Sequence, residues 1–173
     1  MSKKFKLGVV GDPIEHSLSP FIHSRFSRNE NVNINYLAYK VNNDDFDIFI
    51  KEFFHDKEAK GLNITLPHKK KAASLEGEIS QEARYINAVN TILNETDKLH
   101  LFSTDGVGFI KDIENKKFNL INKNILIIGA GAAVESILYR VANAKPMKIT
   151  VINRTIEKAD RLIRKFGNMT KIE

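Results

Sequence analysis

The stretch Gly61-Leu62-Asn63-Ile64-Thr65-Leu66-Pro67-His68-Lys69-Lys70 predicts a β-strand that ends in a group of polar side chains. Apolar residues alternate with Asn63 and Thr65, and Pro67 ends the strand because proline has no N–H to donate to a sheet. The polar side chains from Asn63 to Lys70 therefore lie at the carboxyl end of a strand, where open α/β sheets usually bind ligands. The alternative interpretation is a strand that leads into a solvated helix start with ordinary surface lysines.

Strands and helices alternate on both sides of this stretch, which predicts an α/β domain. Asn43 or Asp44 is expected to cap an amphipathic helix whose apolar residues lie in the core. Those core residues are Phe46, Phe49, Ile50, Phe53 and Phe54. The remaining expected elements are strands over 5–10 and 35–41, short helices over 69–75 and 80–86, and a hairpin of strands 88–93 and 99–102.

The loop after the first strand leads to Ser17-Leu18-Ser19-Pro20. Ser19 is expected to cap a helix whose first position is Pro20, because serine favours the cap position and proline tolerates the first turn. Ser19 can therefore be explained by its structural role as a helix cap alone, without a role in binding.

The pattern changes near Thr104 and Asp105, either of which is suited to cap a further helix. We expect a first domain over residues 1–104, a connecting helix and linker over 105–121, and a second domain over 122–173.

The second domain has the pattern of a partial Rossmann-type nucleotide-binding domain. The apolar run over 125–128 is expected to form a buried parallel strand. It is followed by a glycine turn, a helix over about 134–143, a strand over 148–152 and a helix over 157–166. In such a βαβ unit the pyrophosphate of a dinucleotide lies over the N-terminus of the first helix. The turn consists of Gly129, Ala130, Gly131, Ala132 and Ala133.

The residues after the second strand of this unit favour NADP over NAD. An NAD site requires an acidic side chain there, whereas this chain has Asn153, Arg154 and Thr155. A guanidinium group binds a phosphate through two hydrogen bonds. The alternative is that Arg154 is a surface residue at a strand end. Val134 occupies the third small position of the glycine fingerprint, so the match is imperfect.

Composition excludes several other classes of function. The 173 residues contain no cysteine, which excludes disulfides and thiolate metal sites, and the histidines are not spaced as a metal site. The net charge of +6 is scattered along the chain, and the densest run, Lys69-Lys70-Lys71, has no interleaved aromatic residues, so we expect small anionic ligands and not nucleic acid. The basic start, residues 1–4, precedes too short an apolar run for a signal peptide, and no segment is long enough to span a membrane. We expect a soluble, cytoplasmic protein.

Taken together, the motifs resemble those of the shikimate dehydrogenase family. They occur in the family's order and cover nearly all of the chain. The matching segments are Ser17-Leu18-Ser19-Pro20, Asn63-Ile64-Thr65-Leu66-Pro67-His68-Lys69, Ala88-Val89-Asn90-Thr91, Thr104-Asp105-Gly106, the turn at Gly129, and Asn153-Arg154-Thr155.

The resemblance implies reversible hydride transfer between NADPH and 3-dehydroshikimate, which gives shikimate in the pathway to aromatic amino acids. It implies that Ser17 and Ser19 hold the substrate carboxylate and that Lys69, paired with Asp105, is catalytic. The ring hydroxyls would meet Asn63, Thr65, Asn90 and Asp105. Chemistry agrees, since ketone reduction places negative charge on an oxygen that an ammonium group can stabilise or protonate. Each residue also keeps a structural alternative: Ser19 and Asp105 as helix caps, Asn90 as a hairpin tie, Lys69 as a solvated side chain.

The chain departs from the family pattern at single residues and in length. The departing residues are Asn87, Ser103, Ala132 and Val134. The sequence stops at Glu173, just after the second helix of a nucleotide-binding fold that needs further strands, so we expect a fragment or a shortened protein. The alternatives to a shikimate dehydrogenase are a non-catalytic shikimate-binding module and a quinate/shikimate dehydrogenase. The oligomeric state is not predicted.

Overall fold

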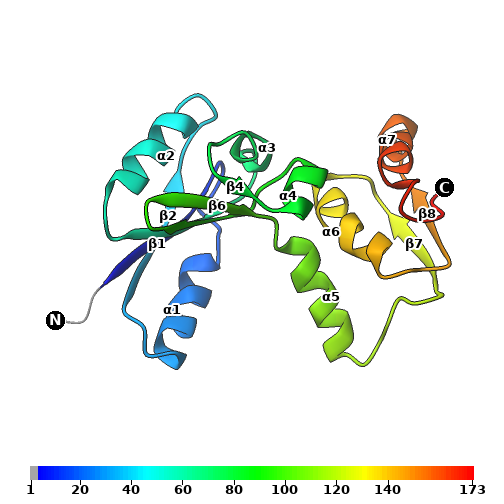
Figure 1. Ribbon diagram of the computed structural model, residues 1–173, viewed down its shortest axis with the longest axis horizontal. Coiled ribbons are helices and arrows are strands. Elements are labelled where there is room, and N and C mark those ends of the chain that lie inside the picture. The colour runs from blue at the N-terminus through cyan, green and yellow to red at the C-terminus, as the bar shows by residue number, and fades with distance from the viewer. Residues whose placement is uncertain (1–3) are drawn as a thin grey trace. The chain divides into compact units, whose positions relative to one another are not determined.

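A computed structural model describes residues 4–173, so that most of the basic start, residues 1–3, lies outside the described residues (Figure 1). The chain divides into two compact units, of which the first ends at Phe102 and the second begins at Ser103.

The first unit is built on a six-stranded mixed sheet with strand order β2-β1-β3-β5-β6-β4. β1 is parallel to β2 and β3, whereas β5 is antiparallel to β3 and β6. The strands are β1 (Phe5–Gly11), β2 (Ile34–Lys40), β3 (Ala59–Ile64), β4 (Glu78–Ile79), β5 (Thr91–Glu95) and β6 (Lys98–Phe102). The predicted strand in the Gly61 stretch is confirmed, and it ends at Ile64.

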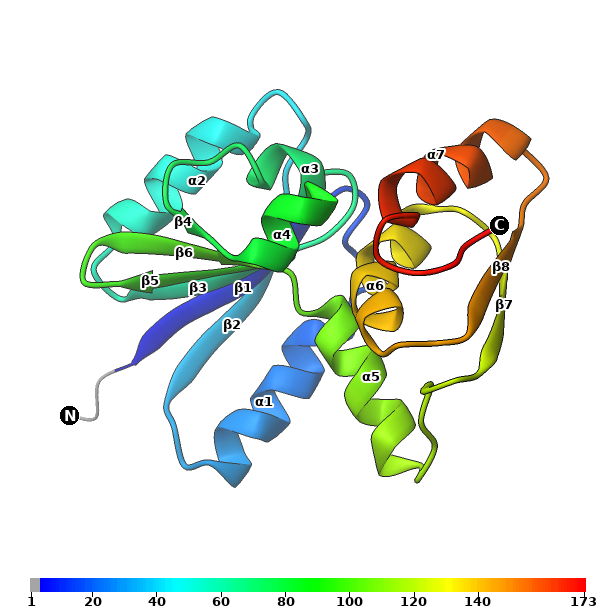
Figure 2. The same ribbon diagram turned by 45° about the vertical axis from the view of Figure 1, so that its right-hand side comes forward.

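Helices cover both faces of this sheet, with α2, α3 and α4 on one side and α1 on the other (Figure 2). Their bounds are α1 (Ser19–Asn29), α2 (Phe46–His55), α3 (Lys69–Ala72) and α4 (Gln81–Ile86). The main core lies on the α2 side, and the predicted core position of the α2 aromatics is confirmed: Phe46 and Phe53 are buried, while Phe49 and Phe54 pack partly buried against them. Fully burying a phenylalanine side chain, as at Phe46, contributes about 1.5–3 kcal/mol.

Two local predictions in this unit are wrong. The cap position of α2 is Asp45, not Asn43 or Asp44, because the side-chain oxygen of Asn42 accepts the N–H groups of Asp44 and Asp45, both at 2.9 Å, and delays the helix. The hairpin turn is also shorter than predicted. Thr96 and Asp97 form it with φ of +51° and +63°, so the residues before them extend β5.

The second unit contains α5 (Asp105–Asn115), β7 (Asn124–Ile128), α6 (Ala132–Asn143), β8 (Lys148–Ile152) and α7 (Ile156–Phe166). β7 and β8 are parallel, as a βαβ unit requires. The end of the chain continues the sheet, since the N–H of Val151 donates to Glu173 and the N–H of Glu173 donates to Ile149. Within this unit α6 and α7 lie on the same side of the strand pair (Figure 2).

The prediction that β7 is a fully buried strand is wrong for the described residues. Its side chains alternate, with Leu126 57% and Ile128 80% exposed, and Ile152 of β8 is 55% exposed. Only the face toward α6 and α7 is covered, because no described element packs on the other face.

Among residues 4–173, no helix is long and apolar enough to cross a membrane, and no group of three or more acidic or histidine side chains is placed to hold a metal ion.

Candidate functional site

The loop between β1 and α1 brings two predicted site residues together. The predicted cap at Ser19 is wrong: the cap position is Leu18, whose φ of −81° and ψ of −4° are already helical and whose side chain makes no capping hydrogen bond. The hydroxyl of Ser17 instead accepts the Ser19 N–H at 3.3 Å. The Ser19 hydroxyl hydrogen-bonds to the side chain of Tyr36, so it is not occupied in capping.

Ser17, Ser19 and Thr65 line one pocket of about 250 Å³. Its apolar wall includes Val9 of β1 and Ile14 of the loop. Thr65 is held there by the sheet, because its N–H donates to the carbonyl of Val10 at 3.0 Å. Three hydroxyls around a small cavity suit a polar ligand that accepts hydrogen bonds.

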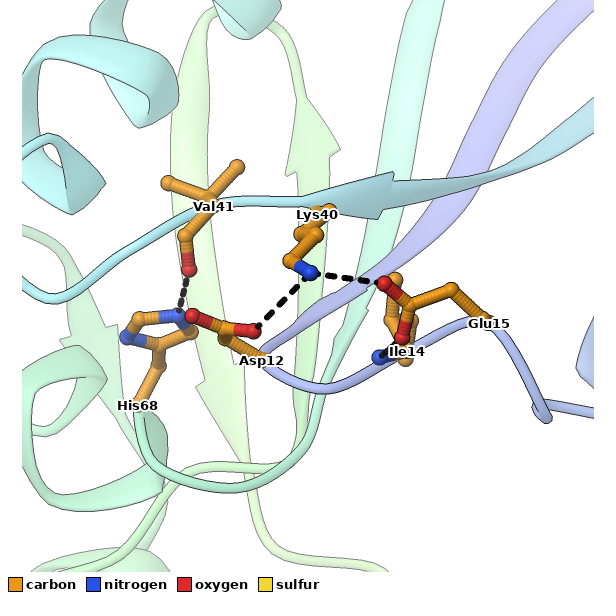
Figure 3. Close-up of polar contacts among 6 residues, drawn as sticks. All are labelled: Asp12, Ile14, Glu15, Lys40, Val41 and His68. Carbon is orange, nitrogen blue, oxygen red and sulfur yellow. Dashed lines mark hydrogen bonds and ion pairs between the residues drawn. The ribbon is translucent and has the colours of Figure 1, made fainter.

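Ion pairs join the loop between β1 and α1 to the end of β2 (Figure 3). The Lys40 ammonium contacts the Glu15 carboxylate at 2.7 Å and Asp12 at 3.8 Å, and the second Glu15 oxygen accepts the N–H of Ile14 at 3.0 Å. The hydrogen bond from Lys40 is the main cause that lowers the pKa of Glu15 to about 2. The loop is thus tied to the end of β2.

His68 anchors the segment that carries Thr65 and Lys69. Its ring is fully buried, stacks on Phe46 with centroids 4.7 Å apart, and its Nε2 contacts the carbonyl of Val41 at 2.7 Å (Figure 3). A carbonyl only accepts, so Nε2 carries the proton. This role of His68 was not predicted from the sequence, although a histidine after an apolar strand and a proline offers a weak signal.

Lys69 is the first residue of α3 and is partly buried. Its carbonyl accepts the N–H of Val89 at 2.9 Å, which joins the start of α3 to the segment that leads to Asn90. The backbone of Lys69 therefore lies beside that of Val89, the residue before Asn90.

Asn63 and Asn90 belong to a chain of side-chain hydrogen bonds on the α1 side of the sheet. The Tyr36 hydroxyl donates to Asn63 Oδ1 at 2.7 Å, and Asn63 Nδ2 donates to Thr91 Oγ1 at 3.3 Å. Thr91 Oγ1 in turn donates to Asn90 Oδ1 at 2.9 Å. Tyr36 and Thr91 were missed in the sequence, because an isolated strand pattern does not say which strands pair.

Asp105 lies in the second unit, at the first position of α5, and is partly buried. Thr104, one of the two predicted cap residues, occupies the cap position, but its side chain makes no capping hydrogen bond. A carboxylate in the first turn is favoured by the helix dipole. Because Lys69 belongs to the other unit, the pairing of Lys69 with Asp105 stays a proposal.

The glycine turn of the second unit fits the phosphates of a dinucleotide. Gly129 has φ of +114°, which favours glycine, and a Cβ at Gly129 or Gly131 would meet nothing within 4 Å. The turn thus leaves open space at the N-terminus of α6, where backbone N–H groups attract anions. Ala132 and Ala133 begin that helix with Gly131 at its cap position.

The predicted cofactor residues after β8 divide into two kinds. Asn153 Oδ1 accepts the N–H of Ala130 at 3.0 Å, and its Nδ2 donates to the carbonyl of Thr155 at 2.7 Å. This side chain thus ties the glycine turn to the β8–α7 loop. Arg154, by contrast, is exposed in that loop.

A larger cavity of about 700 Å³ lies elsewhere in the first unit, beside α2 and the β5–β6 hairpin. It contains none of the predicted site residues. We take the pocket of about 250 Å³ as the candidate site, because it is lined by the hydroxyls of Ser17, Ser19 and Thr65.

Two family models match the chain. Residues 9–92 match the shikimate dehydrogenase substrate binding domain, and residues 112–173 match the family described as shikimate / quinate 5-dehydrogenase. The order of the two matches, with the glycine turn in the second, defines the class of NAD(P)-dependent oxidoreductases with a separate substrate-binding domain. Within that class, the chain belongs to the shikimate dehydrogenase family.

Curated relatives agree with this assignment. The chain is 38% identical over 169 residues to shikimate dehydrogenase (NADP(+)) of Chromobacterium violaceum, covering 97% of this chain and 62% of that protein. It is 40% identical over 163 residues to the enzyme of the same name from Legionella pneumophila, covering 93% and 60%. The chain thus spans about three fifths of the length of these relatives.

Solved structures share the fold. Shikimate 5-dehydrogenase of Listeria monocytogenes, in complex with shikimate and NAD, superposes with a TM-score of 0.93 at 25% identity, covering 100% of this chain and 61% of that one. Shikimate dehydrogenase of Aquifex aeolicus gives 0.90 at 31% identity, covering 100% and 64%. A 5-ketofructose reductase of Gluconobacter shares the fold with a TM-score of 0.91 at 24% identity, covering 98% and 61%. The first unit is the substrate-binding domain, and the second is the start of the NAD(P)-binding domain.

Proposed function

We propose that the protein acts as an NADP-dependent shikimate dehydrogenase, which reversibly reduces 3-dehydroshikimate to shikimate in aromatic amino acid biosynthesis. The observation that carries this proposal is the pocket lined by Ser17, Ser19 and Thr65, on the same side of the sheet as the linked amides of Asn63 and Asn90. Relatives that are 38% and 40% identical to this chain are named shikimate dehydrogenase (NADP(+)), which supports the proposal.

The substrate is a carboxylic acid with a hydroxylated ring, and the two parts would meet different side chains. Ser17 in the β1–α1 loop would donate to the carboxylate, and Ser19 at the start of α1 would turn its O–H from Tyr36 to the carboxylate. The ring hydroxyls would be met by Thr65, the two amides and Asp105. Neutral groups that both donate and accept suit hydroxyls, because a substrate that lacks one would leave a buried polar group unpaired.

Lys69 would act on the oxygen at which the ring changes oxidation state. In the reducing direction its ammonium would stabilise the developing charge and deliver the proton, and Asp105 would orient the ammonium and a neighbouring hydroxyl. The partly buried start of α3 supports this role, since a fixed helix start limits the positions that Lys69 reaches.

NADPH, when bound, would supply the hydride. Gly129 to Ala133 would hold its pyrophosphate, which the open space at the turn supports. Arg154 would meet the phosphate on the ribose, and Asn153 and Thr155 would shape the loop around it. The guanidinium of Arg154 favours NADP over NAD.

A second candidate is a shikimate-binding module without turnover, which the hydroxyl-lined pocket of the first unit would also support. Such a module would bind shikimate without binding NADPH. Quinate is a third candidate ligand, since the second family model also names quinate dehydrogenases.

Replacement of Lys69 by Ala tests the proposal. We expect NADP-dependent oxidation of shikimate to fall by at least about 100-fold, because a positioned proton-transfer group contributes roughly 10²–10⁴-fold. Shikimate binding, measured by calorimetry, should change little. The matched control is Lys70→Ala, which removes an exposed ammonium from the same helix and should leave turnover intact. Strong residual activity in Lys69→Ala would remove Lys69 from its role.

A further inference from the structure

We propose that Tyr36 is a positioning residue of the substrate site: its hydroxyl fixes the orientation of the Asn63 carboxamide, and Thr91 transmits this orientation to Asn90. The inference rests on the proposed function, and it adds two residues that would act on the ligand only through their neighbours.

The sheet register brings these side chains onto one face. Tyr36 pairs with Leu7 across the β2–β1 ladder, and Asn63 pairs with Val9 across the β1–β3 ladder. Tyr36 and Val9 belong to the same small apolar cluster on the α1 side. The tyrosine ring therefore crosses β1, and its hydroxyl reaches Asn63 two strands away.

The hydrogen bonds run in one direction. Tyr36 accepts a hydrogen bond from Ser19 and donates its own proton to Asn63 Oδ1. Asn63 then presents its NH₂ group to Thr91, which donates to Asn90 Oδ1. An amide oxygen only accepts and an amide nitrogen only donates, so this order decides which end of each carboxamide is the donor.

The surroundings keep Tyr36 a donor. Tyr36 is 9% exposed, and its ring stacks on His23 with centroids 4.1 Å apart and an interplanar angle of 9°. Burial raises the pKa of Tyr36 to about 12, against the opposing effect of the Ser19 hydrogen bond. The phenol is thus neutral near pH 7 and retains the proton that Asn63 accepts.

The same strand provides a matched control. Tyr39 lies three residues further along β2, on the opposite face, where its ring packs against Phe49 and Phe53. Tyr36→Phe and Tyr39→Phe each delete one phenolic oxygen from β2, but only the first breaks the chain of hydrogen bonds.

The test compares shikimate with its three monodeoxy analogues, each lacking one ring hydroxyl, by calorimetry on the 173-residue chain. We expect Tyr36→Phe to weaken shikimate binding about tenfold, the size of one hydrogen bond. The loss should nearly vanish for the analogue whose missing hydroxyl is the one bound by the amides. Tyr39→Phe should leave all four affinities within about twofold. A uniform loss for all four ligands in Tyr36→Phe, or no loss, would overturn the inference.

Thr91 gives a second, independent pair of variants. Thr91→Val keeps the shape but deletes the hydroxyl, so it should weaken the binding of shikimate and spare the same deoxy analogue as Tyr36→Phe does. Thr91→Ser keeps the hydroxyl and should bind shikimate as tightly as the unaltered chain. Equal behaviour of the two variants would overturn the role of Thr91.

Failure of the proposed function is distinguishable from failure of this inference. If the unaltered chain does not bind shikimate, the proposed function is wrong, and the role of Tyr36 in substrate binding is overturned with it. The amide orientation itself is then decided by NMR: the side-chain NH₂ resonances of Asn63 should shift in Tyr36→Phe and not in Tyr39→Phe.

Discussion

At the scale of single residues, the candidate site depends on side chains that do not line the pocket but fix the segments that carry the pocket residues. Ser17, Ser19 and Thr65 line the pocket, but Glu15 and Lys40 fix the loop that carries Ser17 and leads to Ser19. His68 does the same for the turn before α3 through its contact with the Val41 carbonyl.

The pair of Glu15 and Lys40 gives a prediction on pH dependence. The pKa of Glu15 is lowered in the folded chain from 4.5 to about 2, so the pair contributes stability above pH 4.5 and loses it as the pH falls through about 2. Lys40→Met should move the pKa of Glu15 back toward 4.5, as measured by NMR titration of its carboxyl carbon. Lys98→Met, which breaks the separate pair with Glu78, should not. An unchanged pKa of Glu15 in Lys40→Met would contradict this geometry.

At the scale of elements, α6 and α7 of the second unit are joined through one buried carboxylate. Glu135 of α6 is 9% exposed, and its two oxygens contact Lys165 at 2.8 Å and Arg161 at 3.6 Å, both on α7. A nearly buried carboxylate needs such partners, since an unpaired charge is costly to bury. These contacts hold α6, which follows the glycine turn, against α7, which follows the loop that contains Arg154.

Glu135→Gln should therefore destabilise this helix pair by about 1–3 kcal/mol, because the Lys165 ammonium loses its charged partner. The measurement is urea unfolding followed through NMR resonances of α7. The matched control is Asp112→Asn, which breaks the exposed Asp112–Lys116 pair on α5 and should cost less than about 0.5 kcal/mol. Equal losses would mean that burial of Glu135 contributes nothing.

Sequence patterns predicted the elements better than their ends and contacts. The aromatic residues of α2 were sufficient to predict the buried face of that helix, and the βαβ pattern predicted the parallel pair β7 and β8, because local periodicity encodes which face is buried. The cap at Ser19 was wrong because Leu18 is already helical, and the burial of β7 was wrong because an apolar run does not reveal whether both faces are covered. The links through Tyr36 depend on the pairing of β2, β1 and β3, which no local pattern contains.

At the scale of the whole molecule, the chain combines a six-stranded substrate-binding domain with the start of an NAD(P)-binding domain. The hydroxyls and amides proposed to bind substrate lie in the first unit, apart from Asp105 in the second. Substrate recognition is therefore expected to depend mainly on the first unit, whereas the proposed turnover would also need Asp105 of the second.

The most direct measurement is an NMR titration of the 173-residue chain with shikimate. The account predicts saturable shifts of the backbone amides of Ser17, Ser19 and Thr65 and of the side-chain amides of Asn63 and Asn90. Residues that line the larger cavity, such as Phe54 and Leu75, should not move. Shifts confined to that cavity, or no shifts at saturating shikimate, would contradict the account.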